Sequence, residues 1–159
     1  MRPPELRCSV ILHDGYILEY LPPFVYNITM TKYVTSLPSG VEPHPTLENI
    51  FVGRDGSVYS NRHRWGQYEN KWRVLSPSPI SKKYPYLRVT LGGRFNIPVK
   101  PYYIHRLVME TFSPTNDETL EVNHIDHDKT NNNLENLEWV THGENMRALS
   151  QYMVDTRSQ

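Results

Sequence analysis

The chain has 159 residues, of which 38% are hydrophobic, enough for one domain with a modest core or one domain and a small appendage. No apolar run approaches the ~18 residues of a membrane span, and the N-terminal residues lack a signal-peptide pattern. Cys8 is the single cysteine, which excludes an intramolecular disulfide framework and a zinc site built from several thiolates. We therefore expect an intracellular protein with no membrane partner.

The formal net charge of zero hides an uneven distribution of charge along the chain. Residues 1–53 hold three basic and five acidic groups, residues 54–106 hold eleven and two, and residues 107–159 hold three and ten. The central third therefore carries a net charge of +9 and the flanking thirds together carry −9. This pattern predicts one strongly positive face on a neutral protein, with a solvated basic surface as the alternative.

The first half of the chain predicts short strands joined by loops. Residues 1–47 are rich in proline and show no helical period, so they form either a small strand unit or a partly ordered extension. Residues 49–61 predict a hairpin around the turn pair Asp55 and Gly56. Residues 60–85 are polar, aromatic and basic, and predict mainly loop, in which Trp65 and Trp72 either pack or stack on bases.

Residues 84–104 predict a second hairpin, because apolar and polar residues alternate on both sides of Gly92 and Gly93. A three-residue loop over 92–94 places Leu91 opposite Phe95 and keeps one face apolar. The second strand contains Pro98, which predicts an edge strand. The other face would then be polar, with these residues: Tyr86, Arg88, Thr90, Asn96 and Lys100.

The last third predicts a helix followed by a strand, a loop, a strand and a second helix. Residues 105–112 form the first helix, which ends before Ser113 and Pro114. Strands over 121–125 and 137–140 flank a loop dense in Asp and Asn. Thr141 and Glu144 have the spacing of a capping box, so the second helix runs from His142 to about residue 152. We expect its packing residues to be Met146, Leu149 and Met153.

Three spaced motifs in this stretch resemble the HNH nucleases, and among them the homing-endonuclease branch found in phages and introns. The motifs are Val122-Asn123-His124-Ile125-Asp126, residues 132–141, and Glu144-Asn145. Residues 104–108 with Phe112, and the strand pair over 50–60, also resemble that branch. The resemblance covers about residues 49–150 and implies an α+β fold, with a ββα-metal (His-Me finger) nuclease core preceded by an antiparallel strand module.

The resemblance also implies a role for each motif residue. His124 matches the general base that activates water, a task suited to a side chain that is neutral near pH 7. Asn123 and Asn145 match the ligands of one Mg²⁺ or Mn²⁺. Asn136 matches the residue that ties the loop and helps to orient the histidine. We expect His105 to pack beneath the site, with a phosphate contact as the weaker option.

The metal site departs from the pattern of many relatives, which have Asp where this chain has Asn123. An amide oxygen is a weaker ligand for a hard cation than a carboxylate, so a catalytically decayed DNA-binding protein is the alternative function. Asp126 and Asp128 are carboxylates that could assist a metal. Two less favoured hypotheses are a zinc site from His124, His127 and His142, and a serine or cysteine hydrolase, for which a Gly-x-Ser-x-Gly motif is missing.

Double-stranded DNA is the expected partner of the central third, bound by a monomer. A β-ribbon can enter the major groove, and basic side chains neutralise phosphates. The candidate DNA-binding residues are Arg62, Arg64, Lys71, Arg73, Lys82, Lys83, Arg88 and Lys100.

The chain is thereby divided into four parts. Residues 1–48 are an N-terminal extension, 49–103 a β-rich basic module that contacts DNA, 104–153 the nuclease core and 154–159 a tail. The predicted function is a metal-dependent DNA endonuclease, located in the cytoplasm of a bacterial host if it is phage- or intron-encoded.

Overall fold

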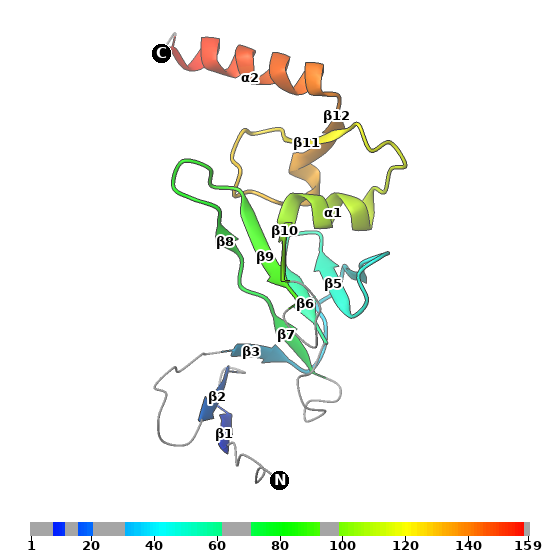
Figure 1. Ribbon diagram of the computed structural model, residues 1–159, viewed down its shortest axis with the longest axis vertical. Helices are drawn as coiled ribbons and strands as arrows, with labels where there is room; N and C mark the ends of the chain where they lie inside the picture. The colour runs from blue at the N-terminus through cyan, green and yellow to red at the C-terminus, as the bar shows by residue number, and fades with distance from the viewer. Residues whose placement is uncertain (1–7, 12–15, 21–30, 62–70, 93–98, 158–159) are drawn as a thin grey trace.

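The computed structural model describes residues 8–11, 16–20, 31–61, 71–92 and 99–157. It confirms the α+β class, because these residues combine antiparallel strands in three sheets with two α-helices and one 3-10 turn. Figure 1 shows an elongated arrangement, with β1 (Cys8–Ile11) and β2 (Tyr16–Tyr20) near one end and α2 (His142–Arg157) at the other. Within the described ranges, neither helix has the length and apolar composition needed to cross a membrane.

The largest sheet has seven strands, in the order β1-β2-β3-β7-β6-β5-β4. Its strands are β1 (Cys8–Ile11), β2 (Tyr16–Tyr20), β3 (Thr31–Val34), β4 (Val41–Pro43), β5 (Ile50–Gly53), β6 (Val58–Ser60) and β7 (Trp72–Val74). The strand unit expected within residues 1–47 is thus present in the described part of that segment. Because β3 and β4 share a sheet with β5 to β7, hydrogen bonding continues across residue 48.

The hairpin predicted around Asp55 and Gly56 is confirmed by the pairing of β5 with β6, in which Val52 lies opposite Val58. Gly56 has a φ of 83°, a conformation that glycine adopts without strain. The prediction of loop for residues 60–85 was incomplete, because β7 and a short strand β8 (Ser78–Pro79) form there. The Trp72 ring meets Phe51 edge-on at 6.4 Å, which favours packing for this tryptophan, whereas Trp65 lies outside the described residues.

The register predicted for the second hairpin is wrong. Strand β9 (Leu87–Leu91) lies between β8 and the edge strand β10 (Lys100–Tyr103), and Leu91 lies opposite Lys100 instead of Phe95. The connection between β9 and β10 is therefore longer than three residues, and the part that contains Asn96 and Pro98 lies outside the described residues. The edge position of the second strand is confirmed.

This register also separates two residues that were expected to share a face. Directly opposed residues in an antiparallel pair point to the same side. Lys100 therefore lies on the side of Leu91, which packs in the core, whereas Arg88 lies opposite Tyr103 on the outer side. Arg88 and Lys100 consequently do not form one polar surface.

The hydrophobic core lies where helix α1 (Ile104–Phe112) packs against β5, β9 and β12 (Leu137–Val140). The helix begins one residue before its predicted start and ends before Ser113, as predicted. The buried residues of α1 pack with apolar residues of the two larger sheets. The most deeply buried residues of this core are Ile50, Val52, Val58, Ile104, Leu107 and Val108.

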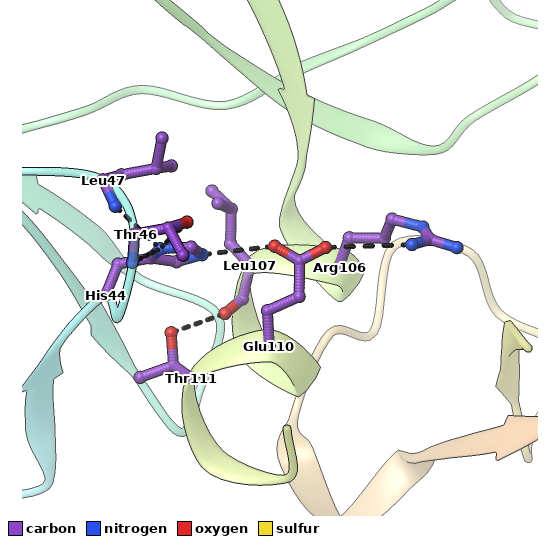
Figure 2. A network of polar contacts seen from close by, with 7 residues as sticks. All are labelled: His44, Thr46, Leu47, Arg106, Leu107, Glu110 and Thr111. Carbon is purple, nitrogen blue, oxygen red and sulfur yellow. Dashed lines mark hydrogen bonds and ion pairs between the residues drawn. The ribbon is translucent and has the colours of Figure 1, made fainter. Parts of the chain in front are cut away.

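A polar network joins α1 to the segment before β5 (Figure 2). The buried His44 ring lies 3.3 Å from the Glu110 carboxylate, which also lies 3.7 Å from Arg106. Arg106 donates a hydrogen bond to the carbonyl of Leu120, and its guanidinium lies over the Trp139 ring. One face of α1 is thereby braced against both neighbouring parts of the fold.

The strand–loop–strand–helix unit forms as predicted. Strands β11 (Glu121–His124) and β12 (Leu137–Val140) are antiparallel, and the turn η1 (Leu134–Asn136) precedes β12. The capping box is confirmed, because the Thr141 backbone N–H donates to the Glu144 carboxylate and the Glu144 N–H donates to the Thr141 hydroxyl.

Helix α2 (His142–Arg157) is longer than expected and has no buried residue. The expected packing by Met146, Leu149 and Met153 is wrong, because these side chains are 38–49% exposed. Figure 1 shows α2 extending beyond the two-stranded sheet, where no described helix or strand covers it.

Candidate active site

His124 occupies the last position of β11, and its side chain turns inward toward α1. The residue is fully buried, at 0% exposure. Its ring lies 5.2 Å from His105 in an edge-on arrangement and 5.9 Å from Tyr86, measured between ring centroids. The expectation that His105 packs beneath this histidine is therefore confirmed. Burial lowers the pKa of His124 below its ordinary value, although the hydrogen bond with Asn132 raises it.

Asn132 fixes which nitrogen of the His124 ring carries the proton. The Asn132 amide nitrogen donates to the carbonyl of Thr130 at 2.9 Å, so its amide oxygen is the atom 3.3 Å from Nε2 of His124. Because an amide oxygen only accepts, Nε2 must be protonated, and a neutral ring then has its lone pair at Nδ1. Nδ1 is buried and, among the described residues, has no hydrogen-bond partner. The ring is thus prepared to accept a proton at Nδ1.

Asn132 was not among the predicted site residues. It is 4% exposed and lies directly behind the turn of the β5–β6 hairpin, where a Cβ on Gly56 would meet the Asn132 Cβ at 3.0 Å. The Leu134 N–H also donates to the carbonyl of Arg54 in this turn. The hairpin therefore supports the residue that orients the histidine. A run of three asparagines is the visible signal, but the run does not indicate which of them faces the ring.

Asn136 ties the loop, as expected, but it does not contact the His124 ring. Its amide oxygen accepts from the backbone N–H of Asp126, and its amide nitrogen donates to the Asp126 carboxylate and to the carbonyl of Asn131. Its own carbonyl accepts from the N–H of Ile125. Asn136 thus holds the chain directly after the histidine.

The two aspartates of the loop also stabilise its turns. The Asp126 carboxylate accepts hydrogen bonds from Asn131, Asn136 and the Asp128 N–H, and these bonds lower its pKa. The Asp128 carboxylate accepts from the N–H and hydroxyl of Thr130.

Asn123 points to the opposite side of β11 from His124 and faces Glu138 across the sheet. The two residues are direct cross-strand partners, and the Asn123 amide nitrogen donates to the Glu138 carboxylate at 2.9 Å. Asn145, in the first turn of α2, makes the same kind of bond to Glu121 at 2.7 Å. Glu121 also accepts from His142 at 2.9 Å, and the Asn145 and His142 hydrogen bonds lower the pKa of its carboxyl.

These bonds determine what the two amides can offer to a cation. A carboxylate only accepts hydrogen bonds, so each amide nitrogen must face its glutamate, and each amide oxygen is turned away from it. In the part of the chain that the structure describes, neither amide oxygen accepts a hydrogen bond. Amide and carboxylate oxygens suit Mg²⁺ and Mn²⁺, so the donor set fits a hard divalent cation.

The zinc site considered from the sequence is contradicted by the positions of the three histidines. His124 packs in the core, His127 stacks with Tyr152 at 4.2 Å, and His142 pairs with Glu121. No group of three His, Cys, Asp or Glu side chains within the described ranges is arranged to hold a metal.

The predicted DNA-binding residues are spread over two sheets and a loop. Arg73 belongs to β7 of the large sheet, whereas Lys82 and Lys83 lie in the β8–β9 loop and Arg88 in β9. The end of that loop reaches the histidine, since Tyr86 contacts the His124 ring and lies under the Lys129 ammonium at 5.6 Å. Lys71 precedes β7 and Lys100 begins β10, while Arg62 and Arg64 lie outside the described residues.

Comparison with known proteins shows that this unit is similar to nucleases. The family described as HNH endonuclease matches residues 102–147. An uncharacterized HNH endonuclease of Acanthamoeba polyphaga mimivirus is 37% identical over 104 residues, which is 65% of this chain and 28% of that protein. A second one from the same virus is 45% identical over 65 residues, covering 35% of this chain and 16% of that protein. The chain thus spans less than a third of either relative.

Among solved structures, the chain is similar to the HNH homing endonuclease I-HmuI, in a structure described as showing DNA binding and cleavage by that protein. The identity is 28%, the TM-score is 0.49, and the match covers 70% of this chain and 63% of that one.

Proposed function

Residues 102–147 match the family described as HNH endonuclease, and from this premise we propose that the chain is a metal-dependent endonuclease that hydrolyses phosphodiester bonds in duplex DNA. In this proposal His124 is the general base, Asn123 and Asn145 hold one divalent cation, and Asn136 maintains the loop between them. The protein would act as a monomer and belong to the homing type.

The observation that carries the proposal is the hydrogen bonding of the His124 ring. The hydrogen bond from Nε2 to Asn132 leaves the lone pair at Nδ1, and burial keeps the ring neutral. A neutral imidazole with one orphaned nitrogen can take a proton from an attacking water. The interaction with Asn132 also stabilises the imidazolium that forms, because the protonated ring still donates from Nε2.

The amide oxygens of Asn123 and Asn145 are the atoms that would hold Mg²⁺ or Mn²⁺. When bound, such an ion neutralises the scissile phosphate and stabilises the departing oxygen. The chain's own contribution is to present the two oxygens, by anchoring each amide nitrogen on a carboxylate.

Basic residues near the histidine are suited to position the DNA backbone. Lys82, Lys83 and Arg88 lie on the β8–β9 loop and the outer side of β9, on either side of Tyr86, which contacts the His124 ring. Arg88 lies opposite Tyr103, which stacks on His105 at 5.5 Å. In this proposal, these basic side chains bind the phosphates of the DNA.

A catalytically decayed DNA-binding protein is the second candidate, and one observation favours it. His124 has no exposed surface, so water reaches Nδ1 only when a covering side chain shifts. The described side chains that contact the His124 ring include Tyr86, His105 and Asn132.

Cleavage of supercoiled plasmid with Mg²⁺, Mn²⁺ or EDTA tests the proposal. We expect metal-dependent product from the wild type, none from His124→Ala, and normal cleavage from the control His127→Asn, which removes a nearby histidine at a left-handed position that asparagine tolerates (φ 62°). DNA binding, measured in parallel by fluorescence anisotropy, should survive in all three proteins. Equal cleavage by His124→Ala would refute the assignment of the base. DNA binding without cleavage by the folded wild type would leave two explanations, a plasmid that lacks the target site or the second candidate.

A further inference from the structure

Two glutamates stand directly behind the proposed metal ligands, and neither is explained by packing. Glu138 is exposed on β12 and accepts a hydrogen bond from the Asn123 amide nitrogen. Glu121 is partly exposed on β11 and accepts one from the Asn145 amide nitrogen. Each proposed amide ligand thus has its own carboxylate partner, contributed by a different strand.

We infer that Glu138 and Glu121 are positioning residues that give the paired asparagines the affinity for a divalent cation that two neutral amides lack. This inference rests on the proposed function, because it concerns the same metal site. The negative charge that attracts the cation would then come from the two glutamates, each of which is hydrogen-bonded to a ligand and is not itself a ligand.

The physical argument begins with the weakness of the ligands themselves. A hard dication prefers charged oxygen, and an amide oxygen carries only a partial charge. A carboxylate that accepts a hydrogen bond from the amide nitrogen draws that N–H dipole toward itself and increases the electron density on the amide oxygen. It also holds the amide in the orientation that directs the oxygen away from the carboxylate, as happens when outer partners orient metal-ligating side chains.

The environment of Asn123 supports this role. Asn123 is 4% exposed and is the direct cross-strand partner of Glu138, so its amide cannot rotate freely. Asn145 lies near the start of a helix without buried residues, and its hydrogen bond to Glu121 joins that helix to β11. Glu138 therefore holds a buried amide within the sheet, and Glu121 holds an amide at the start of an exposed helix.

Mn²⁺ binding to the full chain, measured by isothermal titration calorimetry without DNA, tests the inference. Glu138→Gln and Glu121→Gln each remove one charge but retain an oxygen that can accept the amide hydrogen bond. We expect the dissociation constant for Mn²⁺ to rise about 10- to 100-fold in each, the range typical for outer partners of metal ligands. Glu135→Gln is the matched control, because Glu135 pairs with Arg54 away from both asparagines, and its dissociation constant should change less than about twofold.

A double variant that exchanges the amide and the carboxylate of the Asn123–Glu138 pair tests whether Mn²⁺ affinity can be restored. In Asn123→Asp combined with Glu138→Gln, the glutamine amide donates to the aspartate, the net charge equals that of the wild type, and the ligand itself is charged. We expect Mn²⁺ affinity at least equal to wild type. Asn123→Asp alone places two carboxylates against each other across the strands, which lowers the melting temperature in metal-free buffer.

The outcomes separate this inference from the proposed site. If Asn123→Ala and Asn145→Ala bind Mn²⁺ as the wild type does, the proposed metal site is refuted. If these two variants lose binding while Glu138→Gln and Glu121→Gln match Glu135→Gln, the site stands and the role of the glutamates is refuted. Failure of the double variant to bind more tightly than Glu138→Gln would also refute it. Circular dichroism of every variant verifies that the fold is retained.

Discussion

Acid should destabilise this protein through His105, a buried histidine that has no assigned chemistry. Its ring stacks on Tyr103 at 5.5 Å and meets Tyr86 and His124 edge-on, while its Nδ1 is buried without a partner among the described residues. Burial, followed by the charges of His124, Arg106 and Lys129, lowers the pKa of His105 to about 3. The folded protein therefore keeps this ring neutral in conditions where the unfolded chain protonates it.

The sign and size of the effect follow from this difference in pKa. A histidine with a lowered folded pKa contributes stability that is fully present above the unfolded value of about 6.5 and is lost as the pH falls toward about 3. Between about pH 7.5 and pH 5 the loss from His105 is about 2 kcal/mol, and the full loss at lower pH is of the order of 5 kcal/mol.

Urea denaturation of the wild type and of His105→Phe, measured at several pH values in this range, isolates the contribution. Phenylalanine retains a ring for the Tyr103 stack but cannot take up a proton. We expect the free energy of unfolding of the wild type to fall about 2 kcal/mol more than that of the variant. Tyr103→Phe is the control, because it changes the neighbouring ring and leaves the imidazole, so its offset from wild type should not change with pH. Parallel pH profiles for wild type and His105→Phe would refute the reasoning.

Three further predictions concern the site and its surroundings. The single-turnover cleavage rate should hold at its plateau to below about pH 6.5, because burial lowers the pKa of His124; a rate that already falls between about pH 8 and 7 would contradict this. Arg88→Ala should reduce the slope of log DNA affinity against log salt concentration by about one unit. Lys100→Ala, on the other side of the sheet, should change this slope by less than half as much, and equal effects of the two variants would contradict the observed register. Thr141→Ala should lower the stability of α2 by about 1 kcal/mol and reduce the helical signal in circular dichroism. Glu144→Gln, which keeps a hydrogen-bond acceptor, should lower it less. An unchanged helical signal in Thr141→Ala would show that the cap is unimportant.

The parts of this fold that depend on neighbouring residues could be predicted from the sequence. The capping box fixed the start of α2, and the Asp55-Gly56 pair located the β5–β6 hairpin, because both signals lie within a few residues of the structure they specify. The register of β9 and β10 was missed for the opposite reason. Alternating apolar residues satisfy more than one pairing, and here the choice depends on Tyr102 packing toward the core opposite Val89.

The candidate site was predicted in its residues but not in its contacts. His124, Asn136 and the two proposed ligands lie in the strand–loop–strand–helix unit, and the roles assigned to them stay predictions. The partners that act on them come from elsewhere: Asn132 reaches the ring from the far side of the loop, and Glu138 reaches Asn123 across the sheet. Such pairs follow from register and loop path, which a single sequence specifies only weakly.

The exposed helix α2 has a consequence for how the proposed ligand pair would respond to temperature. Asn145 lies in a helix that has no buried residue and is secured at its start by the capping box and by bonds to Glu121. A 16-residue helix with no buried residue and few tertiary contacts, such as the ring contact between His127 and Tyr152, gains little stability from packing, and isolated helices of about this length are only marginally stable in water. In the proposed site, cation binding and the folding of this first helical turn would be thermodynamically coupled. A bound cation would stabilise the turn, and a folded turn would raise the affinity for the cation. Warming would then weaken cation binding well below the temperature at which the core unfolds, because the helical turn would fray first.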